Sequence, residues 1–188
     1  MSEQFPLISG HPSIDLVNTE VVRRGIRHDL LVTESDLKHW LTTMQETSNL
    51  VGVQIGDGLS LDTLHSVREL RTVLRNGLEQ IAGGQSLESN WRIHLENLIE
   101  RAPFSYKIVH EHLVAIPVGK PADAVASLVS FDVLQLLASG DLFNLHHCAN
   151  PDCVLLFLDA TGRRKWCSMQ ICGNRTKVAR HQSRRAKK

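Results

Sequence analysis

Four cysteines are the residues of this 188-residue sequence best suited to chemistry. They form two Cys-x4-Cys pairs, Cys148 with Cys153 and Cys167 with Cys172, with 13 residues between the pairs. Structural zinc takes four ligands in a tetrahedron and binds thiolate sulfur at about 2.3 Å. Two close pairs can supply that tetrahedron once the intervening chain turns back. The spacing therefore predicts a structural zinc site on four sulfurs, which leaves no coordination position for a substrate.

Two other interpretations of these cysteines stay open in the sequence. The four thiols could be buried or paired without a metal, although disulfides are rare in a reducing cytoplasm. His146 and His147 stand directly before Cys148 and could replace one cysteine, because imidazole nitrogen also binds zinc. We expect zinc on the four cysteines, since two Cys pairs in a cytoplasmic chain are typical of a metal site.

Positive charge is concentrated in the part of the sequence that follows the first cysteine pair. The chain has 21 Lys and Arg against 20 Asp and Glu, a net charge of +1. Ten of the 21 basic residues follow Asp159, the last acidic residue, so residues 160–188 carry +10. Residues 1–159 keep the other 11 basic residues and all 20 acidic ones, a charge of −9. Such a split indicates an acidic body with a separate polyanion-binding element.

The basic residues of this tail are candidates for nucleic-acid contacts. On a helix that starts at Cys172 and runs to about Ala186, cations three or four positions apart form one ridge. Phosphates would accept these cations and release their counterions, whereas Phe157 and Trp166 are needed for packing rather than for base stacking. A solvated tail that only aids solubility is the alternative. The candidates are Arg163, Arg164, Lys165, Arg175, Lys177, Arg180, Arg184, Arg185 and Lys188.

The elements that must position these residues are mostly helices. Five helices are predicted from apolar spacing, capping residues and helix-stopping Gly or Pro residues. The first covers residues 13–24 and is capped by Ser13, and the second starts at a Thr33–Asp36 capping box. The others cover residues 61–82, the segment from a Ser86 cap to Pro103, and residues 121–139. Residues 104–119 predict two paired strands, and residues 48–60 a loop with a short strand at 51–55. Between the cysteine pairs, residues 154–159 and 164–167 predict a hairpin.

The expected fold class is therefore α+β. Residues 1–143 would form a mostly helical domain with a small antiparallel β element, and residues 144–188 a zinc-stabilised β-hairpin and helix. A unit of this second size is too small to be held by its apolar residues alone, so zinc would supply part of its folding energy.

The body itself gives weaker chemical signals. Asp15, Asn18 and Thr19 share one helix face, where they either line a ligand pocket or cap neighbouring backbone groups. We favour the caps, because these side chains habitually bond the backbone. A cluster of arginines on the 61–82 helix is expected to form a solvated face, comprising Arg68, Arg71 and Arg75.

Enzyme activity is not expected. The segment His110-Glu111-His112 matches neither the HExxH pattern of zinc proteases nor the deaminase pattern. A nucleophile-base pair and a Gly-rich phosphate loop are both missing from the sequence. An enzyme with a site around Asp15 and Asn18 is retained as a distant alternative.

The segment that begins at Cys148 resembles the CGNR zinc finger, a treble-clef-type module named after the residues found here as Cys172, Gly173, Asn174 and Arg175. The FLD and KWCSM segments match the same pattern. Upstream, IDLVNT at residues 14–19, HDLL and SDLKHWL resemble the ABATE domain that usually precedes this finger. The resemblance implies a bacterial, stress-responsive transcription regulator whose finger binds DNA.

The functional prediction is a DNA-binding transcription regulator, with an RNA- or ribosome-associated factor as the alternative. The body would sense a small-molecule effector or form a homodimer, since one helix gives few base contacts. We expect no membrane partner and a cytoplasmic location, because no apolar run approaches the ~20 residues of a membrane span and the N-terminal segment has neither a basic start nor an apolar signal core.

Overall fold

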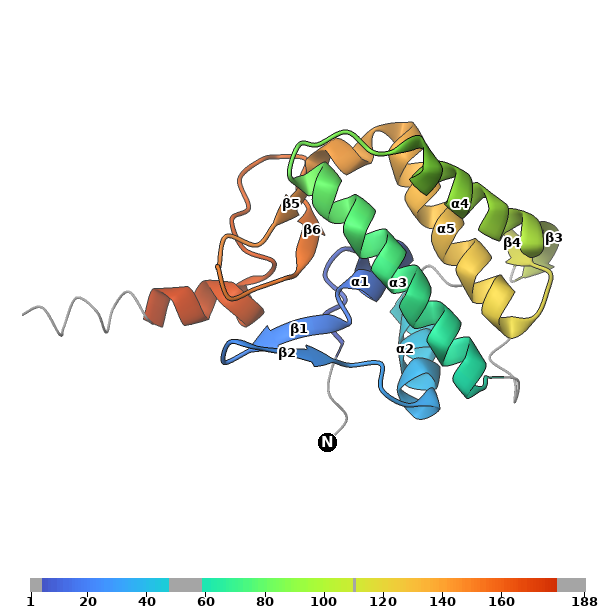
Figure 1. Ribbon diagram of the computed structural model, residues 1–188, viewed down its shortest axis with the longest axis horizontal. Coiled ribbons are helices and arrows are strands. Elements are labelled where there is room, and N and C mark those ends of the chain that lie inside the picture. The colour runs from blue at the N-terminus through green and yellow to red at the C-terminus, as the bar shows by residue number, and fades with distance from the viewer. Residues whose placement is uncertain (1–4, 48–58, 110, 179–188) are drawn as a thin grey trace, which may run out of the picture.

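The computed structural model describes residues 5–47, 59–109 and 111–178 of the chain. The predicted loop over 48–60, with its short strand, therefore lies almost wholly outside the described residues. Helices dominate the described part (Figure 1). The helices are α1 Pro12–Val17, α2 Glu34–Thr47, α3 Leu61–Ala82, α4 Ser89–Arg101, α5 Pro121–Ser139, a 3-10 turn at Asp141–Asn144 and a π-helical turn at Met169–Gly173.

The strands form three separate antiparallel pairs. They are β1 Glu20–Arg23 with β2 Ile26–Asp29, β3 Phe104–Val109 with β4 His112–Pro117, and β5 Leu145–His147 with β6 Leu156–Leu158. The β3–β4 pair confirms the predicted strands, and its turn uses a left-handed residue, Glu111, with φ of 66°. A helical body with small antiparallel elements, followed by a cysteine-bearing C-terminal unit, confirms the α+β expectation.

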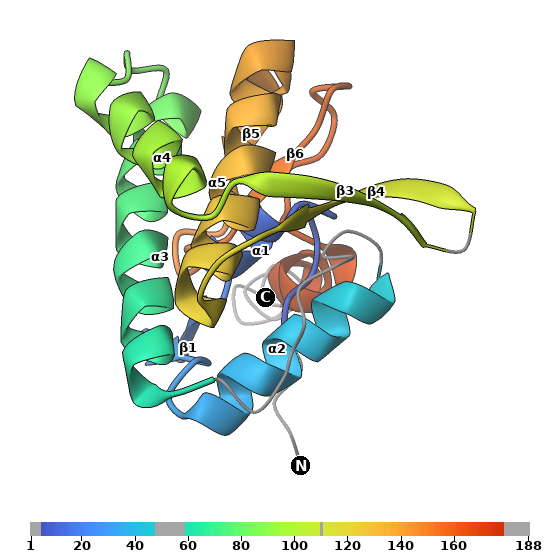
Figure 2. The same ribbon diagram turned by 90° about the vertical axis from the view of Figure 1, so that its right-hand side faces the viewer.

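Helix α5 is the centre of the body and packs against α1, α3 and α4 (Figures 1 and 2). It ends where predicted, at Gly140, whose φ of 82° closes the helix without a Cβ penalty. By length and composition alone α5 could cross a membrane, which corrects the expectation that no such run exists. Core helices pass the same test, and Val125, Val129 and Val133 of α5 are fully buried against its neighbours.

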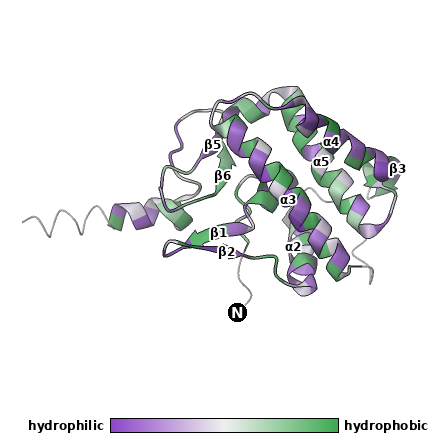
Figure 3. Ribbon diagram, viewed as in Figure 1, coloured by the Kyte–Doolittle hydropathy of each residue, from purple (hydrophilic) through white to green (hydrophobic). Residues whose placement is uncertain are grey.

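Helix α3 has the predicted bounds because its apolar residues recur at three- or four-residue steps. Leu64, Leu70, Leu74 and Leu78 are buried along one face, and hydrophobic and hydrophilic bands alternate along the helix in Figure 3. Leu61, at its first turn, is exposed instead. The stripe holds α3 against α1 and α5 and so places its polar face beside the β1–β2 hairpin.

The first predicted helix, residues 13–24, is wrong in its second half. Helix α1 covers the start of this segment and strand β1 its end. Arg24 and Gly25 have φ angles of 53° and 77° and form the two-residue turn that a tight hairpin requires. The β-branched residues Val21 and Val22 then pair with β2, and this pairing outweighs the helical spacing of the apolar residues.

Two of the three predicted helix caps are also wrong. Ser13 lies inside α1, where its hydroxyl donates to the carboxylate of Asp132. Ser86 precedes the start of α4 and does not cap it. The predicted capping box is confirmed, because the backbone N–H of Thr33 donates to Asp36 Oδ2 at 2.7 Å and the N–H of Asp36 donates back to Thr33 Oγ1 at 3.2 Å.

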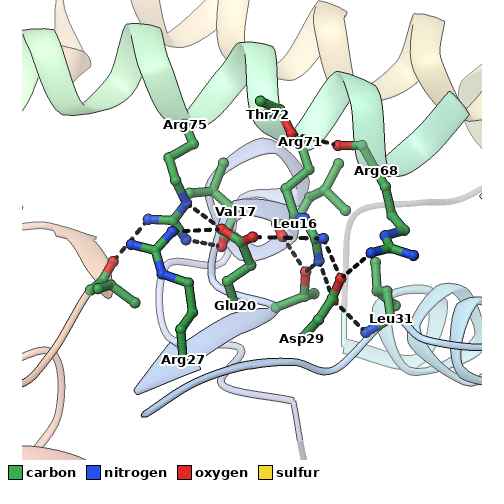
Figure 4. Close-up of polar contacts among 12 residues, drawn as sticks. Leu16, Val17, Glu20, Arg27, Asp29, Leu31, Arg68, Arg71, Thr72 and Arg75 are labelled. Carbon is green, nitrogen blue, oxygen red and sulfur yellow. Dashed lines mark hydrogen bonds and ion pairs between the residues drawn. The ribbon is translucent and has the colours of Figure 1, made fainter. Parts of the chain in front are cut away.

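The arginines of α3 do not form a solvated face, which corrects the prediction. Arg71 and Arg75 are only 3% and 6% exposed, while Arg68 stays partly exposed and pairs with Asp29 at 3.1 Å. Their partners, Glu20 and Asp29, lie on β1 and β2 (Figure 4). Burial of charge is tolerated here because each guanidinium meets a carboxylate.

Candidate metal centre and nucleic-acid interface

The C-terminal unit is built on the short β5–β6 pair, which packs against the body. Leu156 and Phe157 of β6 are fully buried, and β5 and β6 contact α3 and α1 respectively. Strand β6 pairs with β5, ahead of the first cysteine, so the predicted hairpin partner at residues 164–167 is wrong. That segment instead joins the unit through one backbone bond, from the N–H of Ala149 to the carbonyl of Lys165 at 2.8 Å.

The four cysteines come together from three pieces of this unit. Cys148 follows β5, Cys153 ends a turn, Cys167 precedes the π-helical turn, and Cys172 lies within that turn. All four Sγ atoms lie within 4.8 Å of one another, and those of Cys153 and Cys167 are 3.9 Å apart. A regular tetrahedron with bonds of about 2.3 Å has an edge of about 3.8 Å. The four sulfurs therefore fit a zinc ion.

Burial supports a closed, structural site. Cys148, Cys167 and Cys172 are buried, and none of the four cysteines forms a disulfide. His146 and His147 lie on β5 and do not belong to this group of ligands in the described part of the chain. The ring of His146 instead lies 6.0 Å from that of Phe157, centroid to centroid.

The close thiols change one another's acidity. The pKa of Cys148 falls to about 2, because the thiols of Cys153 and Cys167 donate hydrogen bonds to its sulfur. The same contacts raise the pKa of Cys153 to about 12 and also raise the pKa of Cys167, whose protons are held against the Cys148 thiolate. A bound dication would instead favour the thiolate form of the sulfurs that it contacts.

Hydrogen bonds from the surrounding chain also point at the sulfurs. The backbone N–H of Cys167 donates to Cys148 Sγ at 3.4 Å, and the side-chain amide of Asn150 donates to Cys172 Sγ at 3.4 Å. Such outer contacts orient ligands and stabilise thiolate charge. They fit a metal centre better than a set of inert buried thiols.

The last cysteine lies inside the helical segment rather than at its start. The π-helical turn begins at Met169, three residues before Cys172, and continues as α-helix over residues 174–178. Ser168 caps it by accepting a hydrogen bond from the N–H of Ile171 at 2.9 Å. Ile171 packs against the hydrophobic core, whereas Val178 is 55% exposed.

The basic candidates fall into three groups. Four of them are exposed on the surface of the C-terminal unit, hereafter the finger: Arg163, Lys165, Arg175 and Lys177. Arg164 is also exposed, but its guanidinium already has partners in the unit, because it lies 4.5 Å above the Phe157 ring and donates to the carbonyls of Trp166 and Cys167. Arg180, Arg184, Arg185 and Lys188 lie outside the described residues.

The polar cluster of the body makes internal bonds. Asp15 accepts hydrogen bonds from the backbone N–H groups of Ile8, Ser9 and Gly10, and burial raises its pKa. Asn18 bonds the backbone of β6, and the hydroxyl of Thr19 donates to the Leu16 carbonyl and accepts from Arg71. These contacts favour the interpretation of the cluster as caps of neighbouring backbone.

One basic group was missed by the sequence analysis. A groove of about 720 Å³ lies between the β1–β2 turn and the finger, lined among others by Arg24, Asn150, Asp152 and Arg175. Arg24 was overlooked because its segment was predicted as a helix. The signal that could have found it is Gly25, which directly follows an arginine pair between two runs containing β-branched residues.

Comparison with protein families agrees with these features. Residues 144–185 match the CGNR zinc finger, and residues 10–140 match the ABATE family, described as a putative stress-induced transcription regulator. A search of curated proteins gave no match. The order and identity of the two matches confirm the resemblance seen in the sequence. Because the ABATE match covers more than half of the sequence, this chain belongs to the ABATE family of putative stress-induced transcription regulators and carries a CGNR zinc finger.

Proposed function

We propose that this chain is a DNA-binding transcription regulator whose zinc finger binds duplex DNA. The observation that carries the proposal is the exposure of four cationic side chains on a unit that the cysteine cluster holds together: Arg163, Lys165, Arg175 and Lys177. Phosphate oxygens are the natural partners of such a surface, and the counterions released on contact favour binding.

The metal has a structural part in this proposal. Bound zinc would be held by Cys148, Cys153, Cys167 and Cys172 and would fix the finger in shape. The cations then belong to a preformed support, so binding loses less conformational entropy than it would with a free tail. The treble-clef character of the finger is part of the same proposal, as are the phosphate contacts predicted from the sequence for Arg180, Arg184, Arg185 and Lys188.

The body would supply the regulatory half of the function. We assign it homodimerisation or the sensing of a small-molecule effector, and we assign the protein a cytoplasmic location and no catalytic role. The internal bonding of Asp15, Asn18 and Thr19 supports only the last point, because these polar groups already have partners inside the fold.

The test is a salt titration of binding by the full, zinc-loaded chain. Duplex DNA and duplex RNA of matched sequence are titrated at several salt concentrations, and the variants are Arg175→Gln and Lys177→Gln. Each variant should reduce the slope of log affinity against log salt for DNA by about one, because one phosphate contact is lost. Lys107→Gln, an equal charge change on β3 at the opposite end of the molecule, is the control (Figure 1).

The outcomes separate the two candidate functions. Stronger binding to DNA with a reduced slope in both finger variants supports the proposal. Stronger binding to RNA with the same slope changes would instead favour the RNA- or ribosome-associated alternative. Equal slopes for wild type and both finger variants would exclude the finger as the binding surface.

A further inference from the structure

We propose that the β1–β2 hairpin of the body is a second arm of the nucleic-acid interface and binds the same duplex as the finger. The inference rests on the proposed function and extends it to the ABATE domain. It names Arg24 as a phosphate-contacting residue and makes the interface composite, with one arm from each domain.

The hairpin carries its positive charge at the tip and its negative charge at the base. Arg23, Arg24 and Arg27 are exposed at or beside the turn. The acidic residues Glu20 and Asp29 are paired across the base of the hairpin. Their charges are balanced mainly by the arginines of α3, and Glu20 also lies 3.6 Å from Arg27. The exposed cation at the turn itself is Arg24, and the proposal rests on this residue.

The same arginines fix the direction of the hairpin. Arg71 donates to both carboxylate oxygens of Asp29, at 2.6 Å each, and lies 3.8 Å from a carboxylate oxygen of Glu20 (Figure 4). Nε of Arg75 lies 2.6 Å from the second carboxylate oxygen of Glu20. Both strands are thus held to one helix by buried charge-assisted contacts, which are stronger and more directional than neutral ones.

Arg75 also ties this base to the finger. One terminal nitrogen donates to the carbonyl of Val17 in α1 at 2.6 Å (Figure 4). The other donates to the carbonyl of Val154 in the finger at 3.2 Å. A single guanidinium therefore contacts the hairpin, α1 and the segment that leads from Cys153 into β6. The hairpin and the finger are held in one geometry, as two arms of a rigid interface should be.

The groove between the two arms is open and has one arginine on each side, with the carboxylate of Asp152 on the finger side. Arg24 and Gly25 form one wall, and residues 149–152 with Arg175 form the other. Arg175 also lines a smaller space of about 140 Å³ beside Arg23, so it stands between hairpin and finger. The hairpin tip and the finger helix lie at the same end of the molecule in Figure 1. A phosphate backbone has charge at regular intervals and can engage both walls at once, which a small anion cannot do.

The test uses the full, zinc-loaded chain and a duplex DNA, with the charge-removing variant Arg24→Gln. Between about 50 and 200 mM salt, wild-type binding should weaken about threefold more than that of the variant, since one phosphate contact contributes a slope of about 0.9. The double variant Arg24→Gln with Arg175→Gln should lose about two units of slope, because the two arms contact different phosphates. Lys107→Gln on the other exposed hairpin is the matched control.

Three results would overturn the composite interface. A slope unchanged by Arg24→Gln, with a reduced slope in Arg175→Gln, would remove the hairpin arm and leave the proposed function standing. A slope reduced equally by Lys107→Gln would show a general effect of net charge. Binding of the wild type without salt dependence would defeat the proposed function itself. Equal melting temperatures for wild type and Arg24→Gln would show that a slope change reports binding rather than folding.

Discussion

The carboxamide of Asn18 forms two hydrogen bonds with the backbone of Leu156. Its Nδ2 donates to the Leu156 carbonyl at 2.9 Å, and its Oδ1 accepts from the Leu156 N–H at 2.9 Å. Both residues are fully buried. The amide thus satisfies the free edge of β6 in the way a neighbouring strand would. The first helix of the body and the finger share these bonds although 138 residues separate them.

Replacing Asn18 with Ala should destabilise the whole chain. The variant leaves a buried N–H and a buried carbonyl of Leu156 without partners, and each such group costs roughly 1–3 kcal/mol. We expect the free energy of unfolding to fall by about 3 kcal/mol, measured by urea denaturation of the zinc-loaded protein. Asn90→Ala, on the exposed surface of α4, should change it by less than about 0.5 kcal/mol. Equal stability of wild type and Asn18→Ala would contradict this account.

Removal of zinc should weaken the body as well as the finger. The buried side chains of Leu156 and Phe157 belong to the same hydrophobic core as α1 and α3, so a loosened finger exposes part of that core. Chelation, or the variant Cys167→Ser, should lower the melting temperature of the full chain and make the remaining thiols reactive. The measurements are metal content per chain, thermal unfolding and thiol labelling. A chelated protein that unfolds at the same temperature as the metal-loaded one would argue against a structural role.

The ion pair of Asp29 with Arg71 should make stability fall in acid. Burial raises the pKa of Asp29, but hydrogen bonds and charge from Arg71 outweigh this, so the pKa lies below its ordinary value. A lowered pKa means that the stabilisation is complete above the ordinary value, near 3.9, and is lost as pH falls through the folded-state pKa. Unfolding free energies measured from pH 6 downwards should show this loss.

The variant Arg71→Met isolates the pair in the same experiment. It removes a nearly buried cation, leaves Asp29 without its main partner and should cost about 3 kcal/mol at neutral pH. Its acid-dependent loss of stability should be smaller than that of wild type, because Asp29 loses the largest of the interactions that lower its pKa and keeps only those with Leu31 and Arg68. Parallel pH curves for the two proteins would show that another group is responsible.

Features that depend on the spacing of residues within a short segment could be predicted from the sequence. The bounds of α3 follow from its apolar stripe, and the metal centre follows from two Cys-x4-Cys pairs, since both signals lie within short stretches of chain. Contacts between residues that are far apart in the sequence could not be predicted in this way. The spacing of Arg71 and Arg75 predicts a solvated face, because nothing in their own helix shows that Glu20 and Asp29 lie opposite them. The contact between Asn18 and β6 also joins residues that are far apart in the sequence. The same is true of Arg24 and the finger, which line one groove.

The carboxylate of Asp152 gives a last test of the groove between the hairpin and the finger. Asp152 is exposed and is the acidic residue among those that line the space between Arg24 and Arg175. Because it repels phosphate, Asp152→Asn should increase affinity for duplex DNA by about two- to threefold at low salt, and less at high salt, where the charge is screened. The change keeps the shape of the side chain and does not remove the bond from the Asp152 N–H to Asn150 Oδ1.

The control for this variant is Glu100→Gln, which removes one negative charge from the exposed surface of α4, away from the finger. It should leave DNA affinity unchanged within error. An increase confined to Asp152→Asn places the duplex at the groove, because screened electrostatic effects fade beyond about 10 Å at 0.1 M salt. An equal increase in both variants would mean that net charge, and not the groove, governs binding.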